Sequence, residues 1–199
     1  MKGWRIVVLA LFAVGLSLAA AFARLGWGEE GLRAAIRITA ATSLVLFAAA
    51  FSASALAALA PSRPTRWQRA NRRHLGIAFG LSHVVHGVAI VTLAATGAGD
   101  VLPSTAVEVA GGTAAYVFIV FMLATSFDRT AAWVGRRAWT VAHTTGGYLI
   151  LAVFLVSYGG RALESPAYLP PVLVLLTVLA LRVARAVVLW GRQPGATVG

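Results

Sequence analysis

The chain has 199 residues, of which 59% are hydrophobic and only 12% are charged, whereas soluble domains carry about a quarter charged residues. The formal net charge of +11 comes from arginines that flank apolar runs, which is typical of membrane topology and argues against nucleic-acid binding. Cysteine is absent, which excludes disulfides, thiolate metal sites and cysteine-held iron–sulfur clusters within this chain.

Six apolar runs are long enough to cross a bilayer, since a spanning helix needs about 20 apolar residues. In chain order, the predicted spans are residues 4–23, 38–60, 75–97, 105–126, 139–158 and 168–190. The first ends in Ala21, Phe22 and Ala23, which resembles a signal-peptide cleavage site, but it is longer than the usual apolar region of about 7–15 residues. We therefore expect a retained helix; cleavage would leave five spans. The sequence predicts an all-α, polytopic membrane helical bundle that forms one domain over residues 1–199.

The distribution of basic residues predicts the orientation of this bundle. Of the 17 lysines and arginines, all but Arg24, Arg33, Arg37 and Arg161 lie on the side that holds the N-terminus, residues 61–74 and 127–138, and the end of the last span. Cytoplasmic loops carry the excess of basic residues, so both termini are predicted to face the cytoplasm. Arg182 and Arg185 interrupt the last span, and we expect their side chains to extend outward to the interface.

Three of the four histidines lie inside predicted spans, where an ionisable ring is costly and usually functional. His83 and His86 are three residues apart and share one helical face, while His143 lies on the fifth span. Imidazole is a common ligand of haem iron, so the pattern predicts a single buried haem b. Counting from Arg72 and Arg136 places His83 about 6 Å and His86 about 10 Å deeper than His143, which favours His83 as its partner.

Small and polar residues surround these histidines. Glycines at 76, 80 and 87 and the run Thr144, Thr145, Gly146, Gly147 permit close helix packing or leave volume for a bound group. The hydroxyls of Ser82, Thr144 or Thr145 are candidates to fix an imidazole tautomer. The arginines near the cytoplasmic helix ends primarily mark topology and are also candidate partners of haem propionates: Arg72, Arg73, Arg136 and Arg137.

Plainer interpretations compete with a haem site. A histidine inside a membrane can simply hydrogen-bond a neighbouring helix, and the glycines can be ordinary packing residues. His74 adjoins Arg73, so we expect it to be solvated and not a ligand. A zinc or copper site needs three or four close ligands, and the sequence places no cysteine or carboxylate at a matching depth.

Several motifs occur in the order found in one membrane family. The third span begins Arg72, Arg73, His74, Leu75, Gly76, Ile77 and continues to Phe79 and His86; the other motifs are Arg37–Thr39, the pair Thr125 and Ser126, and Trp139 followed by His143. Together they resemble the ferric-reductase-like transmembrane superfamily, and in size the chain is similar to the haem-binding subunit of bacterial periplasmic methionine sulfoxide reductase. The resemblance covers roughly residues 33–158 and implies that His86 and His143 are haem ligands.

The sequence departs from that family at two positions. The family usually has a second histidine about 13 residues after the first on the fifth span, where this chain has Val156, and Tyr148 lies five residues after His143 instead of four. The missing histidine argues against two haems and leaves the pairing of His86 in doubt. His83, which the family motif does not require, is the candidate to compensate.

These observations predict a b-type haem protein that passes electrons from a cytoplasmic-side donor or quinol across the inner membrane to an external acceptor. No glycine-rich strand-to-helix turn is present, so a separate flavin reductase, a bound flavin or a quinol has to supply the electrons. The resemblance implies a periplasmic reductase partner or ferric chelates as acceptor, with this chain as the electron-transfer subunit of an oxidoreductase. The alternatives are a non-redox haem- or metal-binding membrane subunit and a quinone-binding oxidoreductase subunit.

Overall fold

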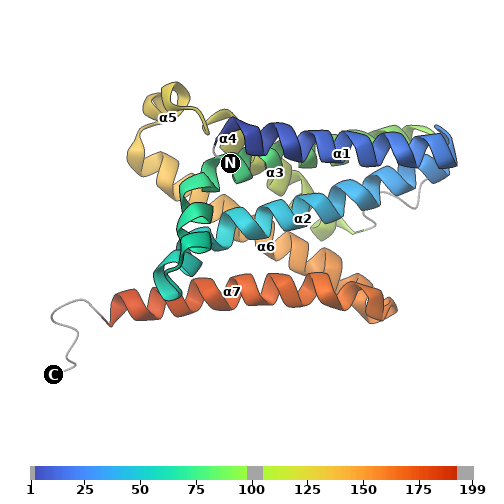
Figure 1. Ribbon diagram of the computed structural model, residues 1–199. Coiled ribbons are helices and arrows are strands. Elements are labelled where there is room, and N and C mark those ends of the chain that lie inside the picture. Colours follow the sequence, from blue (N-terminus) through green and yellow to red (C-terminus); the bar gives the residue numbers. More distant parts are fainter. Residues whose placement is uncertain (1–2, 98–104, 192–199) are drawn as a thin grey trace.

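A computed structural model describes residues 3–97 and 105–191, apart from the side chain of Val107. Within these ranges the chain is helical and contains no strand. The helices are α1 (Trp4–Leu25), α2 (Glu29–Leu59), α3 (Arg63–Ala95), α4 (Ala106–Ala124), α5 (Asp128–Val134), α6 (Arg136–Glu164) and α7 (Leu169–Trp190), with a 3₁₀ turn at Pro166–Tyr168 before α7 (Figure 1). The predicted all-α bundle is therefore confirmed. Lys2 and Arg192, which were counted in the prediction of orientation, lie outside the described residues.

Five helical segments in the described part of the chain are long and apolar enough to cross a membrane. They are α1, α2, α3, α6 and the segment Pro166–Trp190, while α4 and α5 qualify only as a pair bent by 115°. The count is thus five or six, against six predicted. The start of α1 and the end of α7 lie toward the same side of the bundle (Figure 1). The cytoplasmic placement of that side stays a prediction.

Two helices begin well before the predicted spans. The start of α2 is stabilised by acidic residues in its first turn and by an ion pair between Glu29 and Arg33, whose Oε1 and Nε atoms are 2.7 Å apart. The start of α3 is a capping box, in which Ser62 and Thr65 each bind the other's backbone N–H. Most of the predicted loop 61–74 is therefore helix. The predicted loop 127–138 instead contains α5, a turn at Gly135 with φ 82°, and the start of α6.

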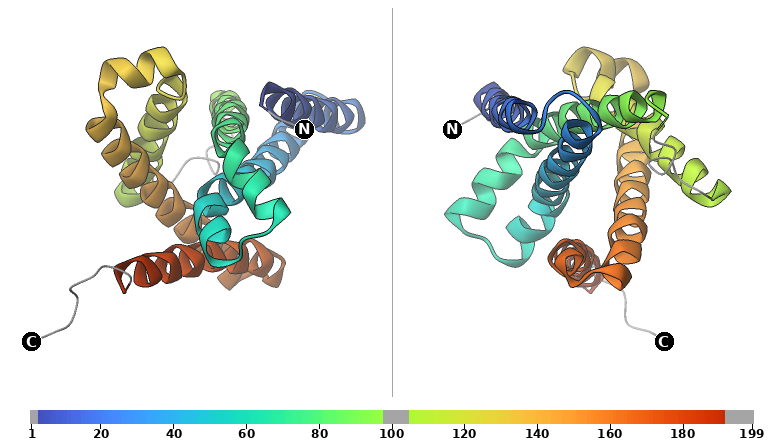
Figure 2. Two further views of the ribbon diagram at one scale, coloured as in Figure 1. Left: turned by 60° about the vertical axis from the view of Figure 1, so that its left-hand side comes forward. Right: turned by 90° about the vertical axis from the view of Figure 1, so that its right-hand side faces the viewer.

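The core lies where α2, α3, α4, α6 and α7 meet. Its buried residues are Leu44, Phe47, Phe79, Ala115, Ile119, Ile150, Leu151, Phe154 and Leu175. α2 packs along α3, and α6 packs against α4 and α7 (Figure 2). Polar bonds join α2 to α3 within this packing, including one from Ser43 to Ser82 (Oγ to Oγ 3.0 Å).

At most of the glycines near the histidines, a neighbouring side chain occupies the space that a Cβ atom would need. A Cβ atom at Gly146 would lie 2.7 Å from Phe118, one at Gly147 would meet the Phe51 ring, and one at Gly87 would lie 2.9 Å from Tyr116. These glycines serve close helix packing and leave no space for a bound group. Gly76 differs, because nothing lies within 4 Å of its Cβ position.

Candidate functional site

His83 and His86 lie side by side on α3, as their spacing predicts, with ring centroids 5.0 Å apart. His86 faces α2. Its Nδ1 atom lies 3.1 Å from the carbonyl oxygen of Ile36 and 3.1 Å from Oγ1 of Thr39. A carbonyl oxygen can only accept, so Nδ1 of His86 carries the proton and donates it to Ile36. The neutral ring then has its lone pair on Nε2, for which the described residues provide no hydrogen-bond partner.

This arrangement of His86 is the one that metal-bound histidines adopt. A ligating imidazole usually donates its other ring N–H to a carbonyl or carboxylate, which fixes the tautomer and the ring orientation. Thr39 is fully buried and its hydroxyl donates to the carbonyl of Ala35 at 2.6 Å, so it accepts from His86. The residue that orients His86 through its backbone, Ile36, has no signature in the sequence, because any residue carries a carbonyl group.

His83 occupies an aromatic pocket formed by three helices. Its ring centroid is 5.6 Å from that of Phe79, 5.1 Å from that of Tyr116 and 5.5 Å from that of Phe154, and the residue is 7% exposed. Its Nδ1 atom is buried and has no hydrogen-bond partner among the described residues. An unpaired buried polar atom costs about 1–3 kcal/mol, so the fold holds His83 at an energetic penalty.

His143 belongs to a separate polar cluster at the end of α4. Its Nε2 atom lies 3.0 Å from Oγ1 of Thr125, and its ring stacks on Trp139 with centroids 4.0 Å apart. The indole N–H of Trp139 donates to the carbonyl of Thr125 at 2.9 Å. The threonine and the tryptophan–histidine motif that the sequence singled out therefore meet in space, and together they tie α6 to the end of α4.

The structure does not bring His143 together with His83 or His86. His83 contacts Phe154, which lies about 16 Å beyond His143 along α6 at 1.5 Å per residue. The estimate of about 6–10 Å from the sequence was too small, because Arg136 does not lie level with Arg72. α6 starts beyond the bent α5, which shifts its register against α3.

These residues can therefore supply one axial ligand to a haem, but not two to the same haem. His86 presents an oriented nitrogen, but His143 lies too far along the bundle to bind the same iron atom. Phe79 and Phe154 occupy the space beside His83, with ring centroids 6.3 Å apart. Among the described residues, no group of three or more histidine, cysteine or acidic side chains is placed to hold a metal ion.

The four arginines predicted as propionate partners fall into two pairs. Nη1 of Arg72 donates to Ser54 at 2.8 Å, and Nη1 of Arg73 donates to the exposed carboxylate of Asp128 at 2.8 Å. Arg136 and Arg137 instead line a hollow at the start of α6, which Ala142, the chain neighbour of His143, also lines.

Two other residues differ from the sequence-based interpretation. Arg182 does not extend outward: its guanidinium carbon lies 4.2 Å from the Phe51 ring centroid and 5.0 Å from that of Tyr148, whose hydroxyl accepts from its Nε. In the sequence, the signal for this cation–π contact was an arginine inside an apolar span of a chain that also contains aromatic residues. His74 is half-buried, and packs edge-on against Trp4 at 5.7 Å.

Comparison with known proteins identified no relative of this chain. No family model matches the sequence, and no curated protein matches it.

Proposed function

We propose that this protein is a b-type haem protein that carries electrons across the bacterial inner membrane, with His86 as an axial ligand. The observation that supports the proposal is the hydrogen bond from Nδ1 of His86 to the Ile36 carbonyl, which leaves Nε2 free to bind iron. A bound haem would supply reversible one-electron chemistry at its iron. The several helices able to span a membrane are consistent with transfer across a bilayer.

The residues of this chain have distinct parts in the proposed site. Ile36 and Thr39 hold the imidazole of His86 in one tautomer, which raises its basicity as a ligand. The apolar core, whose Phe79 and Phe154 contact the neighbouring His83, would exclude water from a bound haem and thereby affect its reduction potential. Electrons reach the site from a flavin reductase, a bound flavin or membrane quinol and leave to an external acceptor such as a periplasmic reductase.

The test is an absorption spectrum with pyridine-haemochrome quantification on the purified protein. We expect about one haem b per chain in the wild type and a reduced-minus-oxidised b-type spectrum after dithionite. His86→Ala should lose the haem, whereas His74→Ala, which changes the histidine packed on Trp4, should keep it. A wild-type protein that shows no haem absorbance and binds no added haem would refute the proposal and favour a non-redox membrane subunit.

A quinone-binding subunit is the second candidate, favoured by the unpaired Nδ1 atom of His83. The ring of His83 lies beside that of Tyr116, so a quinone headgroup that displaced the tyrosine ring could accept a hydrogen bond from His83, and the corresponding quinol could donate one to it. In this version His83→Phe keeps the haem but abolishes its reduction by quinol, while reduction by dithionite is unchanged. Equal quinol reduction in the variant and the wild type would exclude a quinone site at His83.

A further inference from the structure

A hollow of about 830 Å³ opens beside the start of α6, below the bend that α5 makes. Its walls are mostly apolar and include Phe118 of α4 and Val141, Ala142 and Thr145 of α6. Arg136 and Arg137 form its mouth. Neither the histidine clusters nor the proposed haem site shares these residues, so the hollow requires its own explanation.

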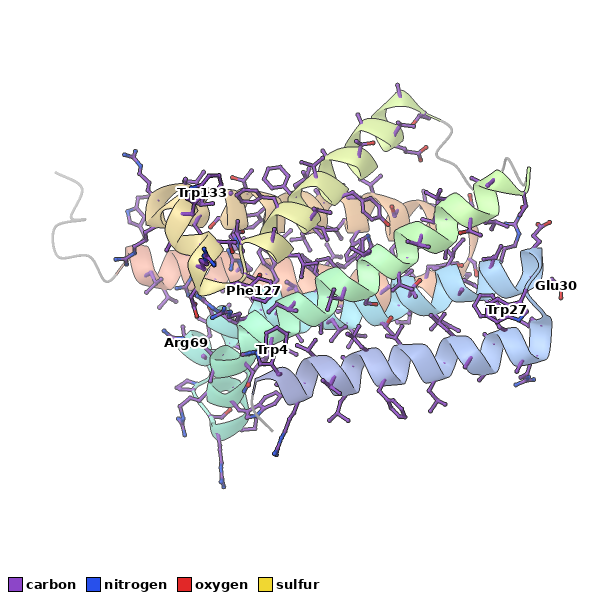
Figure 3. All side chains as sticks on the ribbon, turned by 90° about the horizontal axis from the view of Figure 1, so that it is seen from above. Trp4, Trp27, Glu30, Arg69, Phe127 and Trp133 are labelled. Atoms are coloured by element: carbon purple, nitrogen blue, oxygen red, sulfur yellow. The ribbon has the colours of Figure 1, made fainter. Side chains whose placement is uncertain are left out.

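The charges at the mouth have no acidic partner among the described residues. Arg136 and Arg137 are exposed, and the ion pairs in the described part of the chain involve other arginines. Trp133, labelled in Figure 3, is 90% exposed and directly precedes Val134, which lines the hollow. Tryptophan and arginine at the end of an apolar helix are typical of the membrane–water interface, where an anionic headgroup would meet this pair.

The length of the hollow matches one leaflet of a bilayer. Arg136 and Thr145 lie about 14 Å apart along α6 at 1.5 Å per residue, and half of the hydrocarbon core is about 15 Å. The mouth also lies on the side with the excess of basic residues, which in bacteria faces the leaflet surface that attracts cations.

We propose that this hollow binds one anionic phospholipid, with the phosphate at Arg136 and Arg137 and an acyl chain along Val141, Ala142 and Thr145. The proposal is independent of the haem. It commits to an anionic lipid because a free anion would leave the apolar walls unoccupied, whereas the phosphate of a zwitterionic lipid is already balanced by its own cationic group and would leave the net charge of the two arginines uncompensated. A bound lipid would brace the bend between α5 and α6, and α6 carries His143.

The experiment counts lipids retained by the purified full chain. Protein reconstituted in equal amounts of phosphatidylglycerol and phosphatidylcholine is delipidated stepwise and examined by native mass spectrometry. Three variants are compared with the wild type: the double change Arg136→Gln with Arg137→Gln, the hollow-filling Ala142→Trp, and the control double change Arg66→Gln with Arg69→Gln. The control removes the same charge from a smaller hollow of about 380 Å³ lined by arginines and Ala70.

We expect the wild type to retain one phosphatidylglycerol after the phosphatidylcholine is lost. Each arginine contributes about a fivefold preference for an anionic lipid, so the Arg136 and Arg137 double variant should bind it about 25-fold more weakly. Ala142→Trp should lose the retained lipid and the control should keep it. The proposal is overturned if the wild type retains neither lipid preferentially, or if the control loses phosphatidylglycerol as readily as the double variant. Binding of glycerol phosphate as tightly as of the lipid would also overturn it.

Discussion

Replacing His143 distinguishes a haem that binds His86 without His143 from a haem that has His143 and a histidine of α3 as its two axial ligands. Two imidazoles that share an iron atom bring their ligating nitrogens to about 4 Å, twice a metal–nitrogen bond of about 2 Å. His143 lies about 16 Å along α6 from Phe154, whose ring centroid is 5.5 Å from that of His83. Even if the 5.5 Å between the His83 and Phe154 ring centroids were directed entirely toward His143, about 10 Å would remain between His83 and His143 along the axis of α6. We therefore expect His143→Ala to keep the wild-type haem content and band positions, whereas His86→Ala loses the haem.

The same variant has a second expected effect on stability. Loss of the bond between His143 and Thr125 should lower the free energy of unfolding by about 0.6 kcal/mol, the average for an interhelical hydrogen bond in a membrane protein. Unfolding in mixed micelles and pyridine-haemochrome quantification on the same samples separate the two effects. A folded His143→Ala protein that has lost its haem as completely as His86→Ala would refute the two-level reasoning and restore the pairing predicted from the sequence.

Three further substitutions test individual contacts. Thr39→Val removes one of the two bonds to Nδ1 of His86 and should weaken haem affinity about 10-fold in a haem titration, since residues that orient a ligand contribute 10–100-fold. Gly147→Ala forces a methyl group against an aromatic ring and should destabilise the fold by about 1–3 kcal/mol in an unfolding titration, whereas Gly76→Ala, which meets open space, should cause no loss. Arg182→Ala should lower the unfolding free energy by about 1 kcal/mol through loss of its cation–π contacts, and an unchanged midpoint would show that they contribute nothing.

Hydropathy predicted the helices, and helical periodicity predicted that His83 and His86 lie together. The hydroxyls predicted to bind an imidazole were those of Ser82, Thr144 and Thr145, whereas the structure places Thr39 beside His86 and Thr125 beside His143. Periodicity succeeds because it concerns residues within one helix, whereas the partners of the histidines come from other helices.

The register between α3 and α6 could not be obtained in this way. Depth was counted from Arg72 and Arg136 as if both marked the same membrane surface. The chain turns through 115° between α4 and α5, and Gly135 then redirects it into α6, so equal counts from the two arginines do not reach equal depths. A hydropathy profile records where apolar residues occur but carries no information on such a bend. The contact between His86 and Ile36 is equally invisible, since it uses a backbone carbonyl.

The difference between His83 and His86 bears on what the site binds. Two hydroxyl groups on α2 have other partners, since Ser43 donates to Ser82 and Thr39 accepts from His86, and Nδ1 of His83 has no partner among the described residues. An apolar side chain of similar size at position 83 would avoid the penalty of about 1–3 kcal/mol that the unpaired nitrogen imposes. A polar group that is not part of the described chain would offset this penalty if it reached the ring. Because Nδ1 of His86 is hydrogen-bonded while Nδ1 of His83 has no partner among the described residues, the haem proposed at His86 and the quinone headgroup proposed at His83 would bind to different histidines, so one would not exclude the other.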